Sequence, residues 1–488
     1  MSKVTVRLPT PLRGFAGGAT DVPLEGSTVG ALVQSLADAH PGLRRHLFNP
    51  EGHLRSFVTV YLNDEDVRYL AKEATPVKDG DVLSIVPAIA GGSPASRPSA
   101  ATPVEKTPSF TSEELRRYSR HLLLPEVGVA GQRRLRESKV LLVGAGGLGA
   151  PTALYLAAAG VGEIGLVDFD AIEVSNLQRQ VLYTSQDVGR PKLEAAKARL
   201  EALNPGTRVV PHSERLTSAH AMELIGAYDL VIDGTDNFPT RYLVNDAAVL
   251  LGKPNVYGSI YRFEGQVSVF DARRGPCYRC LYPEPPPPDL VPSCAEGGVL
   301  GVLPGVVGVL QATEAIKLLL GIGEPLIGRL VLYDALSLKF RELKLQKNPD
   351  CVLCSPQATQ KGLIDYAEFC GVPGAGAAPA AAAVPEITPE GLQAELRSPD
   401  PPLLVDVRDP PEWAISRIEG AVLIPKGELG ERVDEITRAR SVVLYCRSGR
   451  RSADATKLLL DLGFANVRSL KGGINAWSEK VDPSVVRY

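Results

Sequence analysis

A glycine-rich loop, followed about twenty residues later by an acidic side chain, constrains the fold of this chain more than any other feature. The loop, Gly144-Ala145-Gly146-Gly147-Leu148-Gly149, follows an apolar run at 140–143 and opens a helical pattern that extends to Ala159. A second strand-like run, 164–167, leads directly to Asp168. This order of elements predicts a Rossmann-like parallel sheet that binds a nucleotide, with the phosphates at the N-terminus of the helix.

Two strong cations follow this unit in the sequence. Arg179 ends the stretch Ser175-Asn176-Leu177-Gln178-Arg179, and Lys192 ends Gly189-Arg190-Pro191-Lys192. Backbone N–H groups and the helix dipole are enough for the diphosphate of a nicotinamide cofactor. A triphosphate that is about to lose pyrophosphate develops more negative charge, and fixed cations stabilise that transition state. The sequence therefore predicts ATP as the nucleotide, with an NAD-dependent oxidoreductase as the alternative.

A further acid, Asp236, and the neighbouring Asn237 follow the apolar run 230–232, which has the pattern of a buried strand. Ligands of open α/β sheets bind at the carboxyl ends of the strands, so Asp236 is expected at the same edge as the glycine loop. A carboxylate there can hold Mg²⁺ against the phosphates. The alternative is an ordinary turn, because Asp-Gly-Thr-Asp-Asn is rich in turn-forming residues.

Length and composition exclude several classes of protein. A chain of 488 residues predicts about three domains, and a formal net charge of −3 argues against a general nucleic-acid or anionic-membrane binder. No membrane span is expected, because the longest apolar run, 299–310, is shorter than about twenty residues. The first thirty residues lack the apolar stretch of a signal peptide, and seven cysteines are too few for a disulfide scaffold. These features favour a reducing, cytoplasmic location.

Two stretches without apolar periodicity divide the chain into three parts. Residues 93–109 are rich in Ser, Pro, Ala and Thr, and residues 371–385 contain a run of alanines. Both compositions are typical of linkers. The three parts are therefore expected at 1–92, 110–370 and 386–488. Alternating strand and helix patterns in the second and third parts predict an α/β multidomain protein with parallel sheets.

Residues 110–370 resemble the MoeB/ThiF family, relatives of ubiquitin-activating enzymes that adenylate the terminal glycine of a small carrier protein. The motifs that carry the resemblance are Arg117-Tyr118-Ser119-Arg120, the glycine loop, Asp168-Phe169-Asp170, residues 175–180, Lys192 and Thr235-Asp236-Asn237. The resemblance implies a Rossmann-like adenylation domain that uses ATP and Mg²⁺.

The same resemblance implies a role for each matching residue. Asp168 is expected at the ribose and Asp236 at the magnesium, while Arg120, Arg179 and Lys192 neutralise the phosphates. In the family the arginine that matches Arg120 reaches across a dimer interface, which implies a homodimer. The expected nucleotide-contacting residues are Gly147, Asp168, Ser175, Asn176, Leu177, Gln178, Arg179, Lys192, Asp236 and Asn237.

Four of the seven cysteines form two C-x-x-C pairs, Cys277/Cys280 and Cys351/Cys354. Two such pairs supply four thiolates, the donor set of a closed tetrahedral zinc site. The seventy residues between them exceed the spacing of a compact zinc ribbon, so a redox pair and two unrelated pairs remain alternatives. A thioredoxin-like redox pair would open a helix, which neither context suggests. The MoeB/ThiF resemblance favours a structural Zn²⁺ site without a part in the chemistry.

Cys446 ends the strand-like run 442–445 and precedes Arg447-Ser448-Gly449-Arg450-Arg451 and a helical pattern. A strand–loop–helix turn of this kind directs backbone N–H groups inward, which favours the thiolate form of a cysteine. The alternative is a buried structural cysteine that acts as a small apolar side chain.

The third part, 386–488, resembles a single α/β rhodanese domain through the Cys446 loop, Leu404-Val405-Asp406-Val407-Arg408 and Lys471-Gly472-Gly473-Ile474-Asn475-Ala476-Trp477. The resemblance implies that Cys446 carries a persulfide. The competing family, the cysteine phosphatases, has a Cys-x₅-Arg loop that would need arginine at position 452. This chain has Ser452 there, and Arg451 closes a shorter loop, which favours sulfur transfer.

Cys294 lies in Pro292-Ser293-Cys294-Ala295-Glu296-Gly297-Gly298, after the proline run 285–288. A reactive thiol at this position could reach the adenylation site. Its counterpart in the MoeB/ThiF family is proposed to take the acyl group or to cleave an acyl disulfide, so Cys294 is expected to be catalytic. The sequence predicts no role for Cys370.

Residues 1–92 resemble ubiquitin-like sulfur carriers of the ThiS/MoaD/CysO type through Asn63-Asp64-Glu65-Asp66-Val67-Arg68 and an Ala-Gly-Gly ending. Strand-like runs on either side of a helical spacing at 29–36 predict a β-grasp fold. Only a chain end without side chains can thread into a narrow cleft beside ATP, so Gly91 and Gly92 are expected to form the carrier C-terminus. An incidental Gly-Gly at a domain end is the alternative.

Gly92, however, is joined by an amide bond to Ser93, whereas such carriers normally end at Gly-Gly. An amide offers no carboxylate to attack ATP. We therefore expect a peptidase to cleave after Gly92 and release the carrier from its own activating enzyme. Otherwise the fused domain is a regulator, and a separate free carrier is the substrate.

Together these features predict an ATP-dependent adenylyltransferase and sulfurtransferase. The Gly92 carboxylate attacks ATP, a persulfide on Cys446 attacks the acyl-adenylate, and Cys294 cleaves the acyl disulfide to give a carrier thiocarboxylate. The expected partners are the sulfur carrier, a peptidase, a second copy of the chain, and thiosulfate or a cysteine desulfurase as sulfur donor. A non-catalytic scaffold that presents the carrier domain is a further alternative. Cysteine synthesis is the favoured destination of the sulfur, with molybdopterin, thiamin and tRNA thiolation as alternatives.

Overall fold

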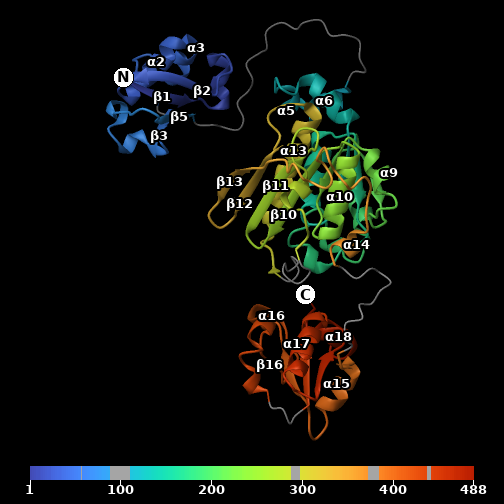
Figure 1. Cartoon of the computed structure of the whole chain (residues 1–488). Helices are drawn as coiled ribbons and strands as arrows, with labels where there is room; N and C mark the ends of the chain where they lie inside the picture. The colour runs from blue at the N-terminus through green and yellow to red at the C-terminus, as the bar shows by residue number, and fades with distance from the viewer. Residues whose placement is uncertain (56–57, 88–109, 287–296, 372–383, 437–440, 488) are drawn as a thin grey trace. The chain divides into compact units, whose positions relative to one another are not determined.

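The computed structural model describes the chain except for residues 56–57, 88–109, 287–296, 372–383, 437–440 and 488. The chain divides into two compact units, Met1–Thr107 and Pro108–Tyr488. The first unit contains one five-stranded sheet, and the second contains an eight-stranded sheet and a separate five-stranded sheet (Figure 1). Each of the three sheets has its own buried core.

The first sheet is mixed, with strand order β2-β1-β5-β3-β4. Its strands are β1 (Ser2–Arg7), β2 (Asp21–Gly26), β3 (Val58–Leu62), β4 (Glu65–Asp66) and β5 (Val82–Pro87). Only β1 and β5 are parallel. Helix α2 (Val29–Ala39) buries Leu32 and Leu36 at the usual helical spacing of four residues. Such a sheet with one long helix is a β-grasp arrangement, which confirms the expected ubiquitin-like fold.

The remaining elements of this unit are short. They are α1 (Thr10–Arg13), η1 (Gly14–Ala16), α3 (Pro41–Leu47), η2 (Val67–Tyr69) and η3 (Lys72–Ala74).

The eight-stranded sheet has the order β13-β12-β11-β10-β9-β6-β7-β8. Its strands are β6 (Lys139–Val143), β7 (Glu163–Val167), β8 (Arg208–His212), β9 (Leu230–Asp233), β10 (Asn255–Tyr261), β11 (Glu264–Phe270), β12 (Arg329–Asp334) and β13 (Lys339–Lys344). The five strands from β8 to β10 are parallel to their neighbours, as predicted for a Rossmann-like domain. Strands β11, β12 and β13 extend the sheet in antiparallel pairs, which the sequence did not indicate.

Helices cover both faces of this sheet. One face packs against α6 (Gly128–Glu137), α7 (Gly149–Ala159), α8 (Lys192–Leu203) and α13 (Leu303–Leu320). The other packs against α9 (Ala221–Gly226), α10 (Phe238–Leu250) and α14 (Tyr366–Phe369). Along β6, Val140 and Leu142 belong to the first core, and Leu141 and Val143 to the second. This alternation follows from the two-residue period of a strand buried on both faces.

Short helices complete the unit. They are α4 (Ser112–Arg117), α5 (Ser119–Leu122), η4 (Val174–Asn176), η5 (Ser185–Asp187) and α11 (Tyr278–Leu281).

Helix α13 is the one described helix that is long and apolar enough, by length and composition, to cross a membrane. Half of its residues are buried inside the protein, where they pack against α7, β10 and β11. The core helix of a globular domain shows the same features, so α13 is weak evidence for a membrane span.

The third sheet is entirely parallel and has the order β14-β18-β17-β15-β16. Its strands are β14 (Glu386–Ile387), β15 (Leu403–Asp406), β16 (Val422–Leu423), β17 (Val442–Tyr445) and β18 (Val467–Leu470). Helix α17 (Arg450–Asp461) packs on one face, and α15 (Pro389–Leu396) and α18 (Gly473–Lys480) pack on the other. A short helix, α16 (Pro410–Ile415), and the turns η6 (Lys426–Glu428) and η7 (Val433–Glu435) complete this part. The predicted α/β rhodanese architecture is confirmed.

Candidate functional site

The glycine loop lies at the carboxyl end of β6 and leads into α7. Gly144 has a left-handed backbone (φ +97°), and a Cβ there would lie 2.8 Å from the carbonyl oxygen of Gly234. A Cβ on Gly149 would overlap the carbonyl oxygen of Gly144. These glycines therefore let the loop fold against both the end of β9 and the first turn of α7. No side chain caps the N-terminus of α7, so its first N–H groups can bind an anion.

Asp168 joins the glycine loop to the end of β7. Its Oδ2 accepts a hydrogen bond from the Ala145 N–H (2.8 Å), and its Oδ1 accepts one from the Asp170 N–H (3.0 Å). Lys192, the first residue of α8, is only 5% exposed. Its Nζ lies 2.8 Å from Asp170 Oδ2 and 3.9 Å from Asp168 Oδ1. The structure thus places Lys192 and Asp168 together, and it reveals Asp170 as the nearest acidic partner of Lys192.

The segment 175–179 lies beside the same loop. Arg179 Cδ is 3.6 Å from the position that a Cβ on Gly147 would take, and Arg179 Nη1 donates to the Ser175 carbonyl oxygen (3.0 Å). The cation therefore lies next to the backbone that is expected to hold phosphate. The other predicted residues of this segment differ in exposure: Ser175 and Gln178 are exposed, Asn176 is half-buried, and Leu177 packs against the core.

Asp236 and Asn237 follow β9 in a loop that touches the glycine loop through Gly234 and Gly144. Asp236 is exposed at this edge of the sheet. Asn237 caps helix α10, because its Oδ1 accepts a hydrogen bond from the Thr240 N–H (3.0 Å). The structure therefore brings Asp236 to the predicted edge, with its carboxylate exposed as a cation ligand would need to be.

A residue that the sequence analysis did not identify, Arg241, holds this loop in place. Its Nη2 donates to the Thr235 carbonyl oxygen (2.8 Å), and its Nε lies 3.5 Å from Asp233 Oδ2. Asp233 is fully buried, and burial raises the pKa of its carboxyl group. Arg241 fixes the backbone next to Asp236, yet no sequence signal singles it out, because it occupies an ordinary position inside α10.

Arg120 is not brought to this edge within one chain. It is exposed on α5, and its neighbour His121 contacts Gln132 (3.0 Å), whose Nε2 donates to the Ala159 carbonyl oxygen (2.8 Å). Ala159 is the last residue of α7, whereas the glycine loop lies at the first. A helix of this length spans about 16 Å, so Arg120 lies near the far end of α7 from the loop.

The four paired cysteines form one cluster, although seventy residues separate the two pairs. Their sulfur atoms all lie within 4.8 Å of one another. The Cys277–Cys280, Cys277–Cys351 and Cys280–Cys354 distances are 3.8, 3.7 and 3.4 Å. Zinc–sulfur bonds of about 2.3 Å in a tetrahedron place sulfur atoms about 3.8 Å apart, so the donor set fits Zn²⁺.

One reason for rejecting a redox pair is corrected by the structure. Cys277 does open a helix, because it is the N-cap residue of the four-residue α11. The convergence of all four sulfurs, rather than the local context, is what favours a metal site. Hydrogen bonding to the neighbouring sulfurs raises the pKa of Cys277, so zinc binding at this cluster would have to displace its proton.

A buried ion pair ties the first cysteine pair to α10. Arg279, between Cys277 and Cys280, donates through Nη2 to Asp246 Oδ2 (2.8 Å), and both residues are almost completely buried. The same oxygen accepts hydrogen bonds from Gln360 Nε2 and Tyr366 Oη, each 2.8 Å long. The network therefore joins the cysteine cluster to the segment that ends the eight-stranded domain.

Cys446 lies between β17 and α17 and is only 1% exposed. Its Sγ accepts a hydrogen bond from the Gly449 N–H (3.2 Å) and contacts the Ser452 hydroxyl (3.6 Å). Gly473, with φ +61°, packs so closely on the Cys446 carbonyl that a Cβ there would overlap it. Burial alone would suit a structural cysteine, but donors aimed at the sulfur stabilise a negative charge on it. Ser452, at the position of the phosphatase arginine, is one of them.

Glu412, which the sequence analysis did not identify, binds the last arginine of this loop. Arg451 Nη1 and Nη2 each donate to one Glu412 carboxylate oxygen at 2.7 Å. These hydrogen bonds are the main reason that the pKa of Arg451 is raised. Glu412 follows Asp409 by three residues, a spacing that indicates a helix-capping box and gives no hint of the pair with Arg451.

Several predicted residues lie outside the part of the chain that the structure describes. These are Cys294 and the proposed carrier terminus, Gly91 and Gly92. Cys370, which had no predicted role, is buried in the core beside α14. Burial raises the pKa of its thiol to about 11, as expected for an unreactive cysteine.

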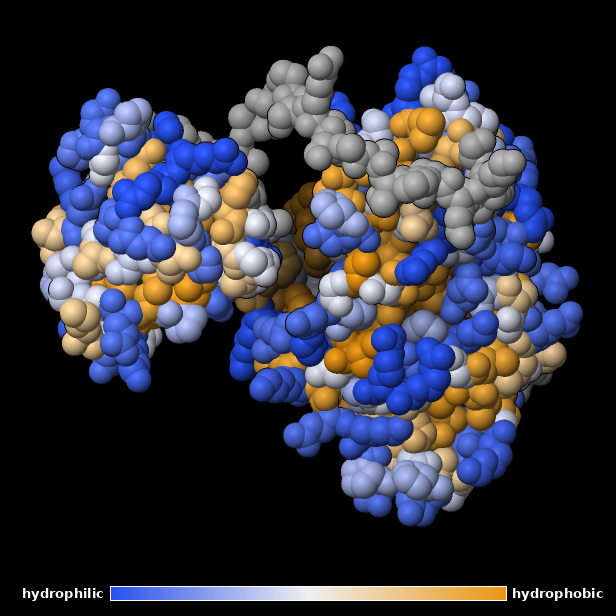
Figure 2. Space-filling model, turned by 90° about the horizontal axis from the view of Figure 1, so that it is seen from above, coloured by the Kyte–Doolittle hydropathy of each residue, from blue (hydrophilic) through white to orange (hydrophobic). Residues whose placement is uncertain are grey.

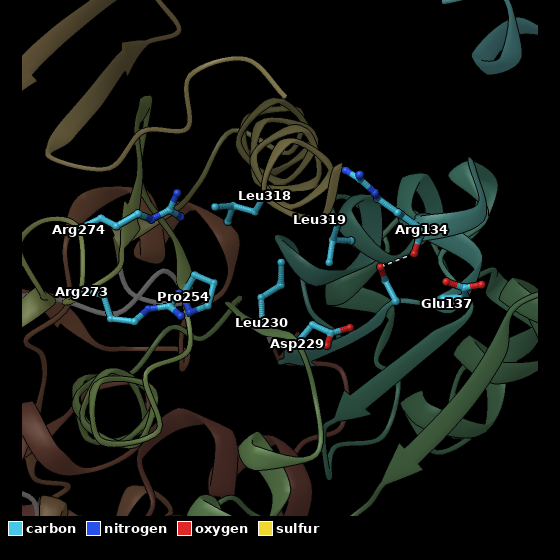
Figure 3. A pocket seen from close by; sticks show the side chains of 10 residues that line it. Arg134, Glu137, Asp229, Leu230, Pro254, Arg273, Arg274, Leu318 and Leu319 are labelled. Atoms are coloured by element: carbon cyan, nitrogen blue, oxygen red, sulfur yellow. Dashed lines mark hydrogen bonds between the residues drawn. The ribbon is translucent and has the colours of Figure 1, made fainter. Parts of the chain in front are cut away.

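A cavity of about 410 Å³ in the eight-stranded domain is a separate feature (Figure 3). Leu230 and Pro254, at the amino ends of β9 and β10, line it, and Figure 3 shows Arg273 and Arg274 on the opposite side from Arg134. The glycine loop lies at the carboxyl ends of the strands. The cavity therefore takes no part in the nucleotide site.

Comparison with known proteins identifies three family models. The ThiF family matches residues 118–353, the rhodanese-like domain matches 388–480, and the ThiS family matches 6–92. The chain is 53% identical to a probable adenylyltransferase/sulfurtransferase MoeZ of Mycobacterium tuberculosis, over 79% of this chain and 98% of that protein. It is 60% identical to the sulfur carrier protein adenylyltransferase of Thermus thermophilus, over 54% and 99%, respectively.

More distant relatives share the same two activities in their names. The adenylyltransferase and sulfurtransferase MOCS3 of Bos taurus is 42% identical over 82% of this chain and 93% of that protein. Among solved structures, E. coli MccB aligns with a TM-score of 0.45 and 24% identity over 49% of this chain and 74% of that chain.

Proposed function

This chain belongs to the adenylyltransferase/sulfurtransferase family that includes MoeZ and MOCS3, and we propose that it activates a sulfur carrier at Gly92 and sulfurates it through Cys446. The chain is an enzyme that combines ThiS, ThiF and rhodanese domains, and it adenylates a carrier and transfers sulfur to it. The relatives compared above are named as adenylyltransferases, which favours adenylation over an NAD-dependent oxidoreductase or a non-catalytic scaffold. One observation carries the detailed proposal: Asp168, Arg179 and Lys192 gather at the uncapped N-terminus of α7.

In the adenylation step, the helix N-terminus and the two cations bind the triphosphate of ATP. The Gly92 carboxylate attacks the α-phosphorus, the bond to the β-phosphate oxygen breaks, and pyrophosphate leaves. Arg179 and Lys192 stabilise the charge that develops on the departing pyrophosphate, and Asp168 binds the ribose. Mg²⁺ would supply a further positive charge, and the exposed Asp236 is the residue that would hold it.

Arg120 acts on the nucleotide of a second copy of the chain in this proposal. Its place near the far end of α7 from the glycine loop supports action in trans rather than in its own site. Around α5 the surface is apolar: Leu123, Leu124 and Tyr155 are 60%, 49% and 56% exposed. Figure 2 views the molecule from above Figure 1 and shows orange apolar areas on the surface of the larger unit. Exposed apolar surface of this kind is typical of a subunit interface.

Mixed dimers test this assignment. Chains with Arg120→Ala and chains with Lys192→Met are each expected to be inactive in ATP–pyrophosphate exchange. If Arg120 acts in trans, re-associated equal mixtures should regain about 25% of the wild-type rate, because half of the dimers contain one complete site. No recovery in mixtures that have exchanged subunits would contradict the proposal.

In the sulfur-transfer step, the persulfide on Cys446 attacks the carbonyl carbon of the acyl-adenylate, and AMP leaves. The product is an acyl disulfide between the carrier and Cys446. The Cys294 thiolate then attacks the Cys446 sulfur, which forms a Cys294–Cys446 disulfide and releases the carrier thiocarboxylate. An external dithiol must reduce that disulfide before the next cycle. The four-cysteine cluster would hold Zn²⁺ through all four thiolates, so the metal would take no part in these steps.

Cleavage after Gly92 supplies the carboxylate in this proposal, and the ThiS match that ends at residue 92 supports it. The decisive test uses residues 1–92, the remaining chain, ATP, thiosulfate and a dithiol. Replacement of one carrier oxygen by sulfur raises the intact mass by about 16 Da, the mass difference between the two atoms. Cys446→Ala should abolish this product and leave ATP–pyrophosphate exchange unchanged. Absence of exchange with the carrier fragment would refute the adenylation proposal.

A further inference from the structure

An ion pair beside the Cys446 loop, between Arg451 and Glu412, has no part in the proposed sulfur-transfer chemistry. Arg451 lies in the first turn of α17, between two residues whose groups bind the Cys446 sulfur, Gly449 and Ser452. The Arg451 side chain is 23% exposed, and the side chain of Glu412, which binds it, is 10% exposed. Attraction to Cys446 is among the causes that raise the pKa of Arg451, so the cation lies within electrostatic reach of the sulfur.

An arginine at this position can make the Cys446 loop bind anions that compete with the sulfur donor. Backbone N–H groups at the N-terminus of α17 and a nearby guanidinium together form a binding site for a tetrahedral dianion. Inorganic phosphate and the phosphates released by an ATP-consuming enzyme would compete with the sulfur donor for that site. Glu412 binds the terminal nitrogens of Arg451 in a bidentate pair, which satisfies the guanidinium fork and compensates its charge.

We propose that Glu412 lowers the affinity of the Cys446 loop for tetrahedral dianions, inorganic phosphate included, by occupying the Arg451 guanidinium. Glu412 itself does not touch the reacting sulfur and acts only through Arg451. The inference rests on the proposed sulfur-transfer function of this loop. Two features of the loop would then weaken phosphate binding: the pairing of Arg451 with Glu412, and serine rather than arginine at position 452.

The test measures phosphate binding at Cys446 directly in the full chain. Iodoacetamide alkylates Cys446, the alkylated peptide is quantified by mass spectrometry, and inorganic phosphate that occupies the loop protects the thiol. Sodium chloride at matched ionic strength corrects for screening. In Glu412→Gln, the phosphate concentration for half-protection should fall by about tenfold or more, because an uncompensated charge a few ångströms away strengthens anion binding by that order. The KM for thiosulfate, another tetrahedral dianion, should fall in the same direction.

Two further variants separate the effect of the Glu412 charge from an effect on folding. Glu395→Gln is a matched control, because Glu395 binds both terminal nitrogens of Arg468 in the same domain at 2.8 and 2.6 Å. It should leave phosphate protection unchanged. The double variant Glu412→Gln/Arg451→Gln removes both charges and should restore wild-type insensitivity to phosphate.

Three results would overturn the inference: equal protection in Glu412→Gln and wild type, the same gain in Glu395→Gln, or a gain that persists in the double variant. The last result would show that the loop relaxes rather than that a charge is uncompensated. Because protection is read without sulfur transfer, the outcome is independent of the proposed function. If Cys446 takes no sulfur from thiosulfate, the proposed function fails while the phosphate result still decides the role of Glu412.

Discussion

Replacing Lys192 by methionine tests the nucleotide site most sharply, since it removes the ammonium group and keeps the unbranched apolar part of the side chain. In the wild-type chain the Lys192 ammonium is 5% exposed, 2.8 Å from Asp170 and 3.9 Å from Asp168. The aliphatic part of the side chain is buried at the start of α8, and methionine fills the same space.

The expected loss is catalytic rather than structural. Removing one group that stabilises developing charge in a water-poor site costs about 10²–10³-fold in rate. The cost in folding stability should stay near 1 kcal/mol or less, because Asp170 is half-exposed and such pairs contribute little. Asp168 also keeps its two backbone hydrogen bonds, so no buried acceptor loses all its partners.

The assay is ATP–pyrophosphate exchange with residues 1–92 as the carrier, together with thermal unfolding of each variant. Lys197→Met is the matched control, since Lys197 lies on the same helix, pairs with Glu201 at 3.0 Å and is 42% exposed in the side chain. It should exchange at close to the wild-type rate. Exchange by Lys192→Met within about threefold of wild type would refute the reasoning, since the magnitude expected for a transition-state contact is far larger. An equal loss in Lys197→Met would refute it as well.

Three further perturbations test other parts of the structure. In Cys351→Ser, bound zinc measured by elemental analysis should fall from about one per chain to near zero, because a tetrahedral site loses one of its four thiolates; full retention would contradict the metal assignment. In Gly149→Ala, the new Cβ overlaps the Gly144 carbonyl, so ATP affinity by calorimetry should fall at least about tenfold while sulfur loading of Cys446 persists. Unchanged ATP binding would show that the loop does not hold the nucleotide. Because the pKa of Cys370 is raised to about 11, its thiolate fraction at pH 8 is about a hundredfold below that of a thiol with pKa 9. Peptide-resolved alkylation of Cys370 should therefore be slow at pH 8 and rise about tenfold per pH unit up to about pH 11.

The part of the fold that the sequence predicted is the part with local signals. The buried strands β6, β7 and β9 are short apolar runs followed by turn residues, and this pattern sufficed for the parallel half of the central sheet. The antiparallel extension was missed, because β12 pairs with β11 across nearly sixty residues of intervening chain. No local pattern specifies a partner strand at that distance.

In the nucleotide and sulfur sites, too, the features with local sequence signals were predicted and the partners from distant segments were missed. The glycine loop and the Cys446 loop were identified because each depends on backbone conformations that only particular residues adopt, as at Gly144 and Gly449. Asp170, Arg241 and Glu412 were missed as functional partners, although each holds a predicted residue or its loop. Each belongs to a motif or helix that has an ordinary local explanation.

The sequence by itself determined the chemistry that this protein carries: a phosphate-binding turn, two pairs of thiols, a cysteine on a helix-terminal loop and a carrier-like first domain. These are properties of short segments, fixed by the conformations that their residues allow. Only the tertiary structure decided which charges meet. The contacts of Lys192 with Asp170 and of Arg451 with Glu412, and the distance of Arg120 from the glycine loop, all depend on strand order and helix packing. Such contacts join distant segments, and an ion pair forms wherever the packed backbone brings opposite charges within reach.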